Sequence, residues 1–305
     1  MKNNKLLTVS IGTSAYNEVN NIKSMLLSVI GQKEEKVKIE EVIVISDGST
    51  DSTAKVAESV KDNRIKIIDD GKRMGKATRI NLLLKMFRGD VLVIVDSDML
   101  LKNKIAIENM TKKFIEDKTT ALVCGNAQPV SARNFLESTI NNYIFARNSL
   151  DKKFSFGDTA YSAHGLLAYS KTFARTLSIP KKIINDDTFS YFMCLSKGFK
   201  YYFAKNGVVL YRSPSSIKDH IYQSIRHLAG GFQLYDYFGK EVVDKGFYVP
   251  GKIKLKLLLY QLKRNPLGYV FLKILNLYCA FRSKNLSKNF DIRWDEIRSS
   301  KRPIL

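Results

Sequence analysis

The chain has few cysteines and no long apolar run. Its only cysteines are Cys124, Cys194 and Cys279. Because they are isolated and odd in number, the sequence predicts neither a disulfide framework nor a thiolate zinc site, and it favours a reducing compartment. The apolar segment 267–281 is shorter than the roughly 20 residues that a membrane-spanning helix needs. Repeats and low-complexity tracts are absent, and only a short apolar segment follows residues 1–5, so no secretory signal is expected.

Acidic residues are scarce relative to basic ones. The sequence has 29 Asp plus Glu against 50 Lys plus Arg, which gives a net charge of +21. Such an excess favours anionic partners: a membrane surface, a nucleic acid or a phosphorylated substrate. A length of 305 residues with 45% apolar content allows one large or two ordinary domains with a buried core.

Apolar segments of two kinds alternate through the first hundred residues. Patterning predicts strands at 6–13, 42–45, 65–68 and 91–95, with helices at 19–30 and 75–87. Strands that alternate with helices at these intervals predict a parallel sheet with crossover connections. The loops that follow the strands then meet at one edge of the sheet, so Asp47, Asp96 and Asp98 should face the same crevice.

Two carboxylates two residues apart, Asp96 and Asp98, come directly after the apolar strand 91–95. Hard oxygen donors at that place can hold Mg²⁺ or Mn²⁺ against the phosphates of a substrate. The ordinary alternative is a solvated turn that happens to carry two acids. The neighbouring loops decide in favour of the metal.

Six short motifs, in order, resemble those of the family-2 glycosyltransferases of the GT-A fold. They are Ala15-Tyr16-Asn17-Glu18, Ser46-Asp47-Gly48-Ser49-Thr50-Asp51, Gly75-Lys76 with Asn81, Asp96-Ser97-Asp98, Asn185-Asp186-Asp187 and Gln223-Ser224-Ile225-Arg226-His227. The resemblance covers residues 6 to about 230. It implies a Rossmann-like α/β fold with a mixed, mostly parallel sheet flanked by helices. It also implies a catalytic domain at 1–230, with a donor half at about 1–100 and an acceptor half at about 101–230.

The resemblance implies a metal-dependent, inverting transfer of a sugar from a nucleotide diphosphate sugar. Uridine diphosphate is the expected nucleotide, and the acceptor is a hydroxyl or phosphate of a glycan or lipid-linked molecule. Mn²⁺ or Mg²⁺ is expected on Asp96 and Asp98, with His220 as a third ligand. The alternative for His220 is a surface histidine beside Asp219.

Besides Asp96, the residues expected at the donor are Tyr16, Glu18, Asp47 and Lys76, and His164 is expected at the donor sugar or the acceptor. The resemblance implies that the tyrosine stacks near the base, that Asp47 accepts a hydrogen bond from it, and that Glu18 contacts the nucleoside. Lys76 begins a helix, where backbone N–H groups favour anions, so it is expected near the diphosphate. The alternatives are a helix cap for Asp47, a solvated lysine, and a core or turn histidine.

The catalytic residues are expected on two helices further along the chain. The resemblance makes Asp187 the general base, with Asp186 beside it, and no covalent nucleophile is then required. Gln223 and Arg226 are three residues apart on a predicted helix, hence on one face, where the arginine neutralises charge on the leaving group. The alternative is that both acids merely cap a helix. Two positions depart from the family pattern: Ser14 replaces a proline, and His227 replaces a tryptophan that stacks on acceptors.

The segment 231–305 is expected to form a basic, amphipathic helical extension. It has fifteen Lys or Arg against six Asp or Glu, and it contains an apolar stripe of Ile253, Leu257, Leu258 and Leu262. A basic helix with an apolar face is typical of one that lies on an anionic membrane. The expected location is therefore cytoplasmic, peripheral at the inner face of the cell membrane. The alternative is a helical hairpin packed on the catalytic core.

Three other functions compete with this interpretation. A processive polysaccharide synthase uses similar motifs, but several membrane spans accompany them, and none is predicted here. A nucleotidyltransferase also uses acids and Mg²⁺ at a sheet edge, but a Gly-rich basic loop usually follows its first strand, unlike residues 14–17. A nucleic-acid-binding protein would suit the charge, yet no known binding motif supports it, so no nucleic acid is expected as a partner.

Overall fold

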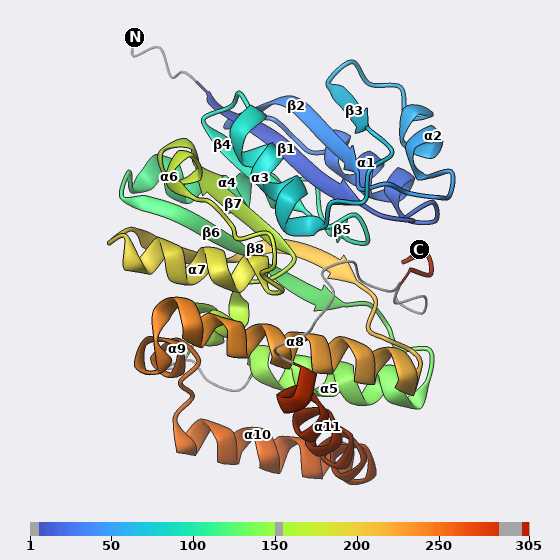
Figure 1. Cartoon of the computed structure of the whole chain (residues 1–305), viewed down its shortest axis with the longest axis vertical. Coiled ribbons are helices and arrows are strands. Elements are labelled where there is room, and N and C mark those ends of the chain that lie inside the picture. The colour runs from blue at the N-terminus through green and yellow to red at the C-terminus, as the bar shows by residue number, and fades with distance from the viewer. Residues whose placement is uncertain (1–5, 150–154, 287–300, 305) are drawn as a thin grey trace.

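A single mixed sheet forms the centre of the protein (Figure 1). The computed structural model describes residues 6–149, 155–286 and 301–304. Within them the strands lie in the order β3-β2-β1-β4-β7-β6-β8-β5. Their bounds are β1 Leu7–Ala15, β2 Val37–Ser46, β3 Ile65–Asp69, β4 Val91–Val95, β5 Leu100–Leu101, β6 Thr120–Pro129, β7 Leu166–Ser170 and β8 Lys200–Tyr211.

Helices cover both faces of this sheet (Figure 1). Their bounds are α1 Ile22–Ile30, α2 Thr53–Glu58, α3 Lys76–Met86, α4 Ala106–Glu116, α5 Phe135–Ser149, α6 Lys171–Thr176, α7 Asp186–Ser196, α8 Ile217–Phe238, α9 Lys240–Gly246, α10 Gly251–Arg264 and α11 Pro266–Leu286. Two short 3₁₀ turns, Phe156–Asp158 and Ala160–Ser162, precede β7.

The predicted parallel sheet is confirmed for its first four strands. β2 pairs in parallel with β1 and β3, and β4 pairs in parallel with β1. Beyond β4 the sheet is mixed, because β7 runs antiparallel to both β4 and β6. The first helix begins at Ile22, three residues later than predicted, because the carbonyl of Glu18 accepts the N–H groups of Asn21 and Ile22 in a turn.

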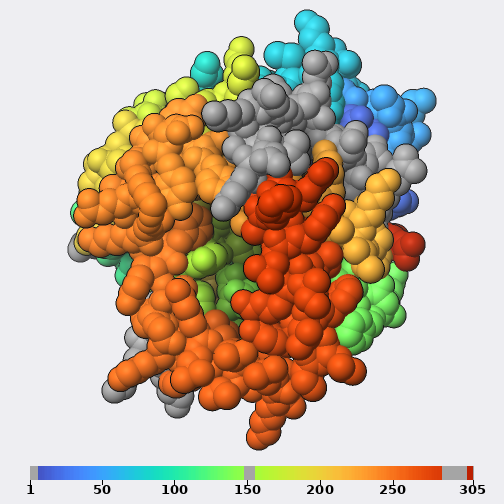
Figure 2. Space-filling view, turned by 60° about the horizontal axis from the view of Figure 1, so that its bottom comes forward, coloured from blue at the N-terminus to red at the C-terminus, as the bar shows by residue number. Residues whose placement is uncertain are grey.

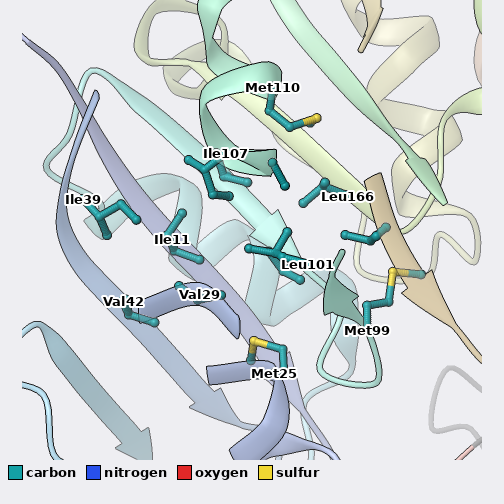
Figure 3. Close-up of a cluster of buried hydrophobic side chains, with 14 of the residues drawn as sticks. Ile11, Met25, Val29, Ile39, Val42, Met99, Leu101, Ile107, Met110 and Leu166 are labelled. Atoms are coloured by element: carbon teal, nitrogen blue, oxygen red, sulfur yellow. The ribbon is translucent and has the colours of Figure 1, made fainter. Parts of the chain in front are cut away.

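Alternation along the strands divides the core between the two faces of the sheet. On β4, Val91, Val93 and Val95 point to one face, and Leu92 and Ile94 point to the other. The first face packs against α1 and α4 through the residues in Figure 3, and the second packs against α3, α6 and α7. Burial of both faces explains why these strands are almost continuously apolar.

The last helices pack on α5 and α8 rather than on the sheet. α11 contacts α8 and α5, and α10 contacts α5 and α11. Ile253 and Leu257 of α10 are buried in a small core with Ala146 and Phe156, so these helices pack on the rest of the protein, as in the alternative of a helical hairpin on the catalytic core. The expected boundary at residue 230 falls inside α8, and the division into domains remains a prediction. None of the helices in the described parts of the chain is long and apolar enough to cross a bilayer.

Candidate active site

The loops that follow β1 and β2 interlock at one edge of the sheet. The N–H of Asp47 donates to the carbonyl of Ala15 at 2.8 Å. The N–H of Thr50 donates to the side-chain oxygen of Asn17, also at 2.8 Å. Asn17 adopts a positive φ of 52°, which asparagine tolerates better than most residues. The first two motifs therefore form one connected wall, as the parallel-sheet prediction requires.

The carboxylate of Asp47 holds the loop before α3. Its side chain is buried, and it accepts hydrogen bonds from Arg73 Nη1 at 2.6 Å, Arg79 Nε at 2.8 Å and the N–H groups of Met74 and Gly75. These donors surround both oxygens. A direct contact between Asp47 and a nucleobase would require the Arg73 arm to move, and that contact remains a prediction.

Two arginines that the motif comparison missed complete this wall. The guanidinium of Arg73 lies 3.3 Å from the ring centroid of Tyr16, the residue that is expected to stack near the base. Arg79 is 2% exposed and bridges Asp47 to Asp70. In the sequence both are ordinary basic residues, and no spacing distinguishes them from the other 48 Lys and Arg.

Lys76 connects the donor loops to the predicted catalytic acids. Its ammonium lies 2.8 Å from Asp96 Oδ1 and 3.8 Å from Asp186 Oδ2. Burial lowers the pKa of Lys76, but the carboxylates of Asp186, Asp96 and Asp187 outweigh burial and raise it well above its usual value. A permanently charged lysine thus lies between motifs 90 positions apart.

Asp98 and Glu18 lie close enough for the charge of Asp98 to act on Glu18. Burial raises the pKa of Asp98 to about 6, with Asp96 adding to the shift and the Lys76 and Lys301 ammonium groups opposing it. Burial also raises the pKa of Glu18 to about 7, and the charge of Asp98 adds to that rise. Carboxylates that lie this close repel one another when both are ionised, and a bound cation would offset the repulsion.

The pair Asp96 and Asp98 suits Mg²⁺ or Mn²⁺. Both ions take oxygen ligands, and Mg²⁺ usually binds through one or two carboxylates while waters and substrate phosphates complete its shell. No cluster of three or more His, Cys, Asp or Glu placed to hold a metal occurs in the described residues. Two protein carboxylates beside a phosphate-bearing substrate fit that mode of binding.

Asp186 and Asp187 form the first turn of α7. Burial raises the pKa of Asp187 to about 7, Asp186 adds to the shift, and Lys76 opposes it. The carboxylate also accepts the N–H of Thr188 at 2.7 Å. Burial likewise raises the pKa of Asp186, which is 8% exposed. A carboxyl with a pKa near neutrality has the property that a general base needs.

A close contact between α7 and α8 brings the last motif to the acids. Asn185 Nδ2 donates to the carbonyl of His227 at 3.0 Å. Gly230 allows this approach, because a Cβ there would lie 2.6 Å from the Asn185 side chain. Arg226 is within electrostatic range of Asp186, although burial lowers its pKa. Gln223, one turn earlier on α8, is half-buried.

Two histidines lie near these charges in neutral form. Burial lowers the pKa of His164 to about 4, with a further contribution from Arg147, and Asp96 opposes the shift. The side chain of His227, which replaces the tryptophan of the family pattern, is exposed on α8, although nearby protein atoms and the charges of Arg226 and His164 lower its pKa.

His220 does not join the acidic residues. Its side chain is 8% exposed, and Nε2 lies 3.3 Å from Ser224 Oγ and 3.5 Å from Asn276 Oδ1, between α8 and α11. It forms no metal-binding group with Asp96 and Asp98. The first turn of α8 packs on α11, so the sequence-based choice of His220 as a third ligand is not supported by its position.

The chain belongs to glycosyltransferase family 2. The model of that family, described as glycosyl transferase family 2, matches residues 10–177, more than half of the 305 residues. The protein is therefore a glycosyltransferase of a family that acts on nucleotide sugars, and its fold is GT-A. This assignment sets the nucleotidyltransferase and nucleic-acid-binding alternatives aside.

Curated relatives match over only part of their length. Glycosyltransferase GlyG of Streptococcus pneumoniae is 29% identical over 107 residues, which are 34% of this chain and 33% of GlyG. Poly-beta-1,6-N-acetyl-D-glucosamine synthase of Staphylococcus aureus is 32% identical over 114 residues, 37% of this chain and 27% of the synthase. The matches thus span about a third or less of each relative.

Solved structures share the fold over much more of the chain. The mannosyltransferase PcManGT of Pyrobaculum calidifontis, solved with GDP-Man and Mn²⁺, has a TM-score of 0.57 at 19% identity and covers 94% of this chain and 77% of its own. Glucosyl-3-phosphoglycerate synthase of Mycobacterium tuberculosis, solved with Mn²⁺, UDP and phosphoglyceric acid, has a TM-score of 0.54 at 18% identity, with coverages of 76% and 79%. At such identities the likeness concerns the fold alone.

Proposed function

We propose that this enzyme transfers a sugar from a UDP-sugar to a lipid-linked or glycan acceptor, with inversion at the anomeric carbon. The observation that carries the proposal is the Lys76 ammonium between Asp96 and Asp186, which brings the donor loops within reach of the buried Asp186 and the half-buried Asp187. That pair includes a carboxyl, Asp187, whose pKa burial raises to about 7. The uridine preference is supported by the UDP in the M. tuberculosis structure and opposed by the GDP-Man in PcManGT.

Asp187 is the proposed general base. The acceptor oxygen attacks the anomeric carbon as the bond from that carbon to the diphosphate oxygen breaks, and the Asp187 carboxylate takes the proton of the acceptor. The attack comes from the face opposite the leaving group, so a single displacement inverts the configuration. Arg226 and Lys76 supply positive charge toward the departing nucleoside diphosphate.

Asp96 and Asp98 are the residues proposed to hold Mn²⁺ or Mg²⁺. A divalent cation held there would supply Lewis-acid stabilisation of the charge on the diphosphate. Tyr16, Glu18 and Asp47 are proposed to line the nucleoside part of the site, Glu18 by direct contact and Asp47 through its hold on Arg73.

A release assay across nucleotide sugars tests the proposal. The protein is incubated with UDP- and GDP-sugars and either Mn²⁺ or Mg²⁺, and free nucleoside diphosphate is measured. We expect slow hydrolysis of one UDP-sugar, abolished by a chelator and by Asp98→Asn. Release from GDP-sugars alone would refute the uridine assignment, and cation-independent release would refute the metal assignment.

The proposed acceptor lies at a membrane, because the C-terminal helices carry an exposed apolar face. On α11 the exposed side chains recur every three or four residues and hence share one side: Leu267, Val270, Ile274, Leu277 and Phe281. Leu255, Leu259 and Leu262 are similarly exposed on α10. These eight residues are called the apolar face below. Figure 2 shows α11 as an orange-red ridge on the side of the molecule formed by these helices.

This face differs from the stripe predicted from the sequence. Ile253 and Leu257 turn inward and are buried against α5, and Leu262 is the one predicted member that is exposed. Because one side of the hairpin already packs on the protein, the exposed side is a second, independent apolar surface. Exposed apolar side chains that gather on one hairpin often mark a surface that a partner or a membrane covers.

Charge decides which partner covers the apolar face. Between residues 246 and 283 the sequence has seven Lys or Arg and no Asp or Glu. Two copies of the chain that met through this face would bring these positive charges together, whereas an anionic bilayer would attract them. A bilayer also suits side chains such as Leu277 and Phe281 beside lysines, the pattern of helices that lie in the membrane interface.

Sedimentation with vesicles tests this part of the proposal. We expect the protein to pellet with phosphatidylserine-containing vesicles at low salt, and to pellet less with pure phosphatidylcholine or at high salt. The variant Ile274→Gln with Leu277→Gln should lose most of this binding. The control Leu27→Gln changes an exposed leucine on α1, 49% accessible, and should bind like the parent. Failure of the parent to pellet, or concentration-dependent dimers that require the apolar face, would refute the membrane assignment.

A further inference from the structure

Lys301 reaches back from near the end of the sequence to the nucleoside side of the proposed donor site. Its ammonium donates to the carbonyl oxygens of Tyr16 and Asn17, the latter at 2.8 Å. It also lies 3.1 Å from Glu18 Oε1 and 5.5 Å from the ring centroid of Tyr16. Three consecutive residues of the first donor motif therefore contact the same ammonium group, that of Lys301, which lies 285 positions from Tyr16 in the sequence.

Separate contacts hold the segment 301–304 in this place. Arg212 Nη2 donates to the carbonyls of Pro303 and Ile304 at 3.2 and 3.3 Å. The side chain of Ile304 is 8% exposed and belongs to the core on the β1 face of the sheet. Asn21 Nδ2 donates to the carbonyl of Lys301 at 3.2 Å. A buried apolar side chain and two side-chain donors thus hold the lysine in position.

We infer that Lys301 is a positioning residue of the donor site. Its ammonium gathers two successive carbonyls on one side of the 16–18 turn, whose central residue, Asn17, has a positive φ of 52°. This fixes the ring of Tyr16. The same charge offsets Glu18, which lies close enough to Asp98 for the charge of Asp98 to act on it. An anionic diphosphate then meets less negative potential at the cation-binding edge.

This inference rests on the proposed donor site and predicts a specific kinetic pattern. The contacts of the ammonium within the described parts of the chain are with the loop that holds the nucleoside, so its loss weakens binding of donor and transition state alike. Its hydrogen bonds and its ion pair in the motif are all with oxygen acceptors, and hydrogen bonds that involve a charged group are stronger than neutral ones. The alternative is a segment that occupies the place of the donor and inhibits the enzyme.

The test compares Lys301→Met with Arg302→Met in the full chain. Both variants lose one positive charge, but Arg302 is exposed. Binding of UDP with Mn²⁺ is measured by calorimetry, and donor KM and kcat are measured by nucleotide release. We expect Lys301→Met to raise the UDP Kd and the donor KM about tenfold with kcat within twofold, and Arg302→Met to match the parent. Ile304→Asp, which releases the segment without altering the ammonium, should reproduce the Lys301→Met result.

Four outcomes would overturn the inference. Tighter UDP binding or faster turnover in Lys301→Met would mean that the segment inhibits. Equal losses in Lys301→Met and Arg302→Met would mean that net charge alone matters. Unchanged UDP binding in Lys301→Met, or parent-like behaviour of Ile304→Asp, would refute the positioning role. Neither result would contradict the proposed function as long as the parent binds nucleotide. A parent that binds no nucleotide with either cation would refute the proposed function itself.

Discussion

The protonation of Asp187 sets a pH dependence that can be calculated from the site. Burial raises the pKa of this carboxyl to about 7, and Lys76 is the neighbour that opposes the rise. A general base works only when deprotonated, so turnover should increase with pH through this value. One unit below the pKa about a tenth of the carboxyl is ionised, and we expect kcat at pH 6 to be roughly a tenth of its plateau above pH 8.

Substitution of Lys76 should move this profile. Lys76→Met removes the ammonium that stabilises the ionised forms of Asp186 and Asp187, so the acidic limb should shift to higher pH. Lys76→Arg keeps the charge and should shift the limb less. The assay is kcat against pH at saturating donor and acceptor, with Mn²⁺ held constant. An acidic limb in Lys76→Met at or below that of the parent would refute the electrostatic reasoning.

Removal of the base should separate chemistry from binding. Asp187→Asn should lower kcat by about 10²- to 10⁴-fold, the usual contribution of general base catalysis, and leave the UDP Kd within about twofold. The control Asp236→Asn makes the same change at an exposed position of α8 and should turn over like the parent. Equal turnover in Asp187→Asn and the parent would refute the assignment, as would an unchanged acidic limb in its residual activity.

Two further predictions concern stability. Gly230→Ala should lower the free energy of unfolding by about 1–3 kcal/mol and reduce kcat, because its Cβ would lie 2.6 Å from the Asn185 side chain. In the control Gly231→Ala, the new Cβ meets nothing within 4 Å, so this change should be neutral or stabilising. Thermal melts and turnover of both variants test this prediction. In the folded protein Glu18 and Asp187 keep their protons up to about pH 7, whereas the unfolded chain releases them near pH 4. The stabilisation that comes from these protonated groups is complete below pH 4 and is lost as pH rises through 7. Without a divalent cation, Tm should drop by a few degrees from pH 6.5 to 8, and Glu18→Gln with Asp187→Asn should flatten this slope.

Much of the fold could be predicted because its signals are local. The segment 91–95 is uniformly apolar because β4 is buried on both faces, and a strand of that kind must end where polar residues begin. That single boundary places Asp96 and Asp98 at the carboxyl edge, and parallel connections bring Asp47 to the same edge. Short-range pattern and chain connectivity together were sufficient for these positions.

Other features depend on contacts that no local pattern encodes. His220 has the chemistry of a metal ligand, yet the packing of α8 on α11 directs it to Asn276. The sequence left open whether the predicted stripe of α10 lies on a membrane or packs on the core, and the structure buries Ile253 and Leu257 against α5 while Leu255 and Leu259 are exposed. Helical periodicity shows that a face exists; only packing decides whether it is buried.

The sequence by itself determined the first four strands, the acidic pairs and the family, since each of these depends on residues close together in the chain. The tertiary structure alone decided the charge balance of the site. Lys76 lies between Asp96 and Asp186, and Lys301 pairs with Glu18, only because the folded chain brings them together. Burial also raised the pKa of Asp187 to about 7, since the loss of hydration around a carboxyl depends on everything packed near it in space.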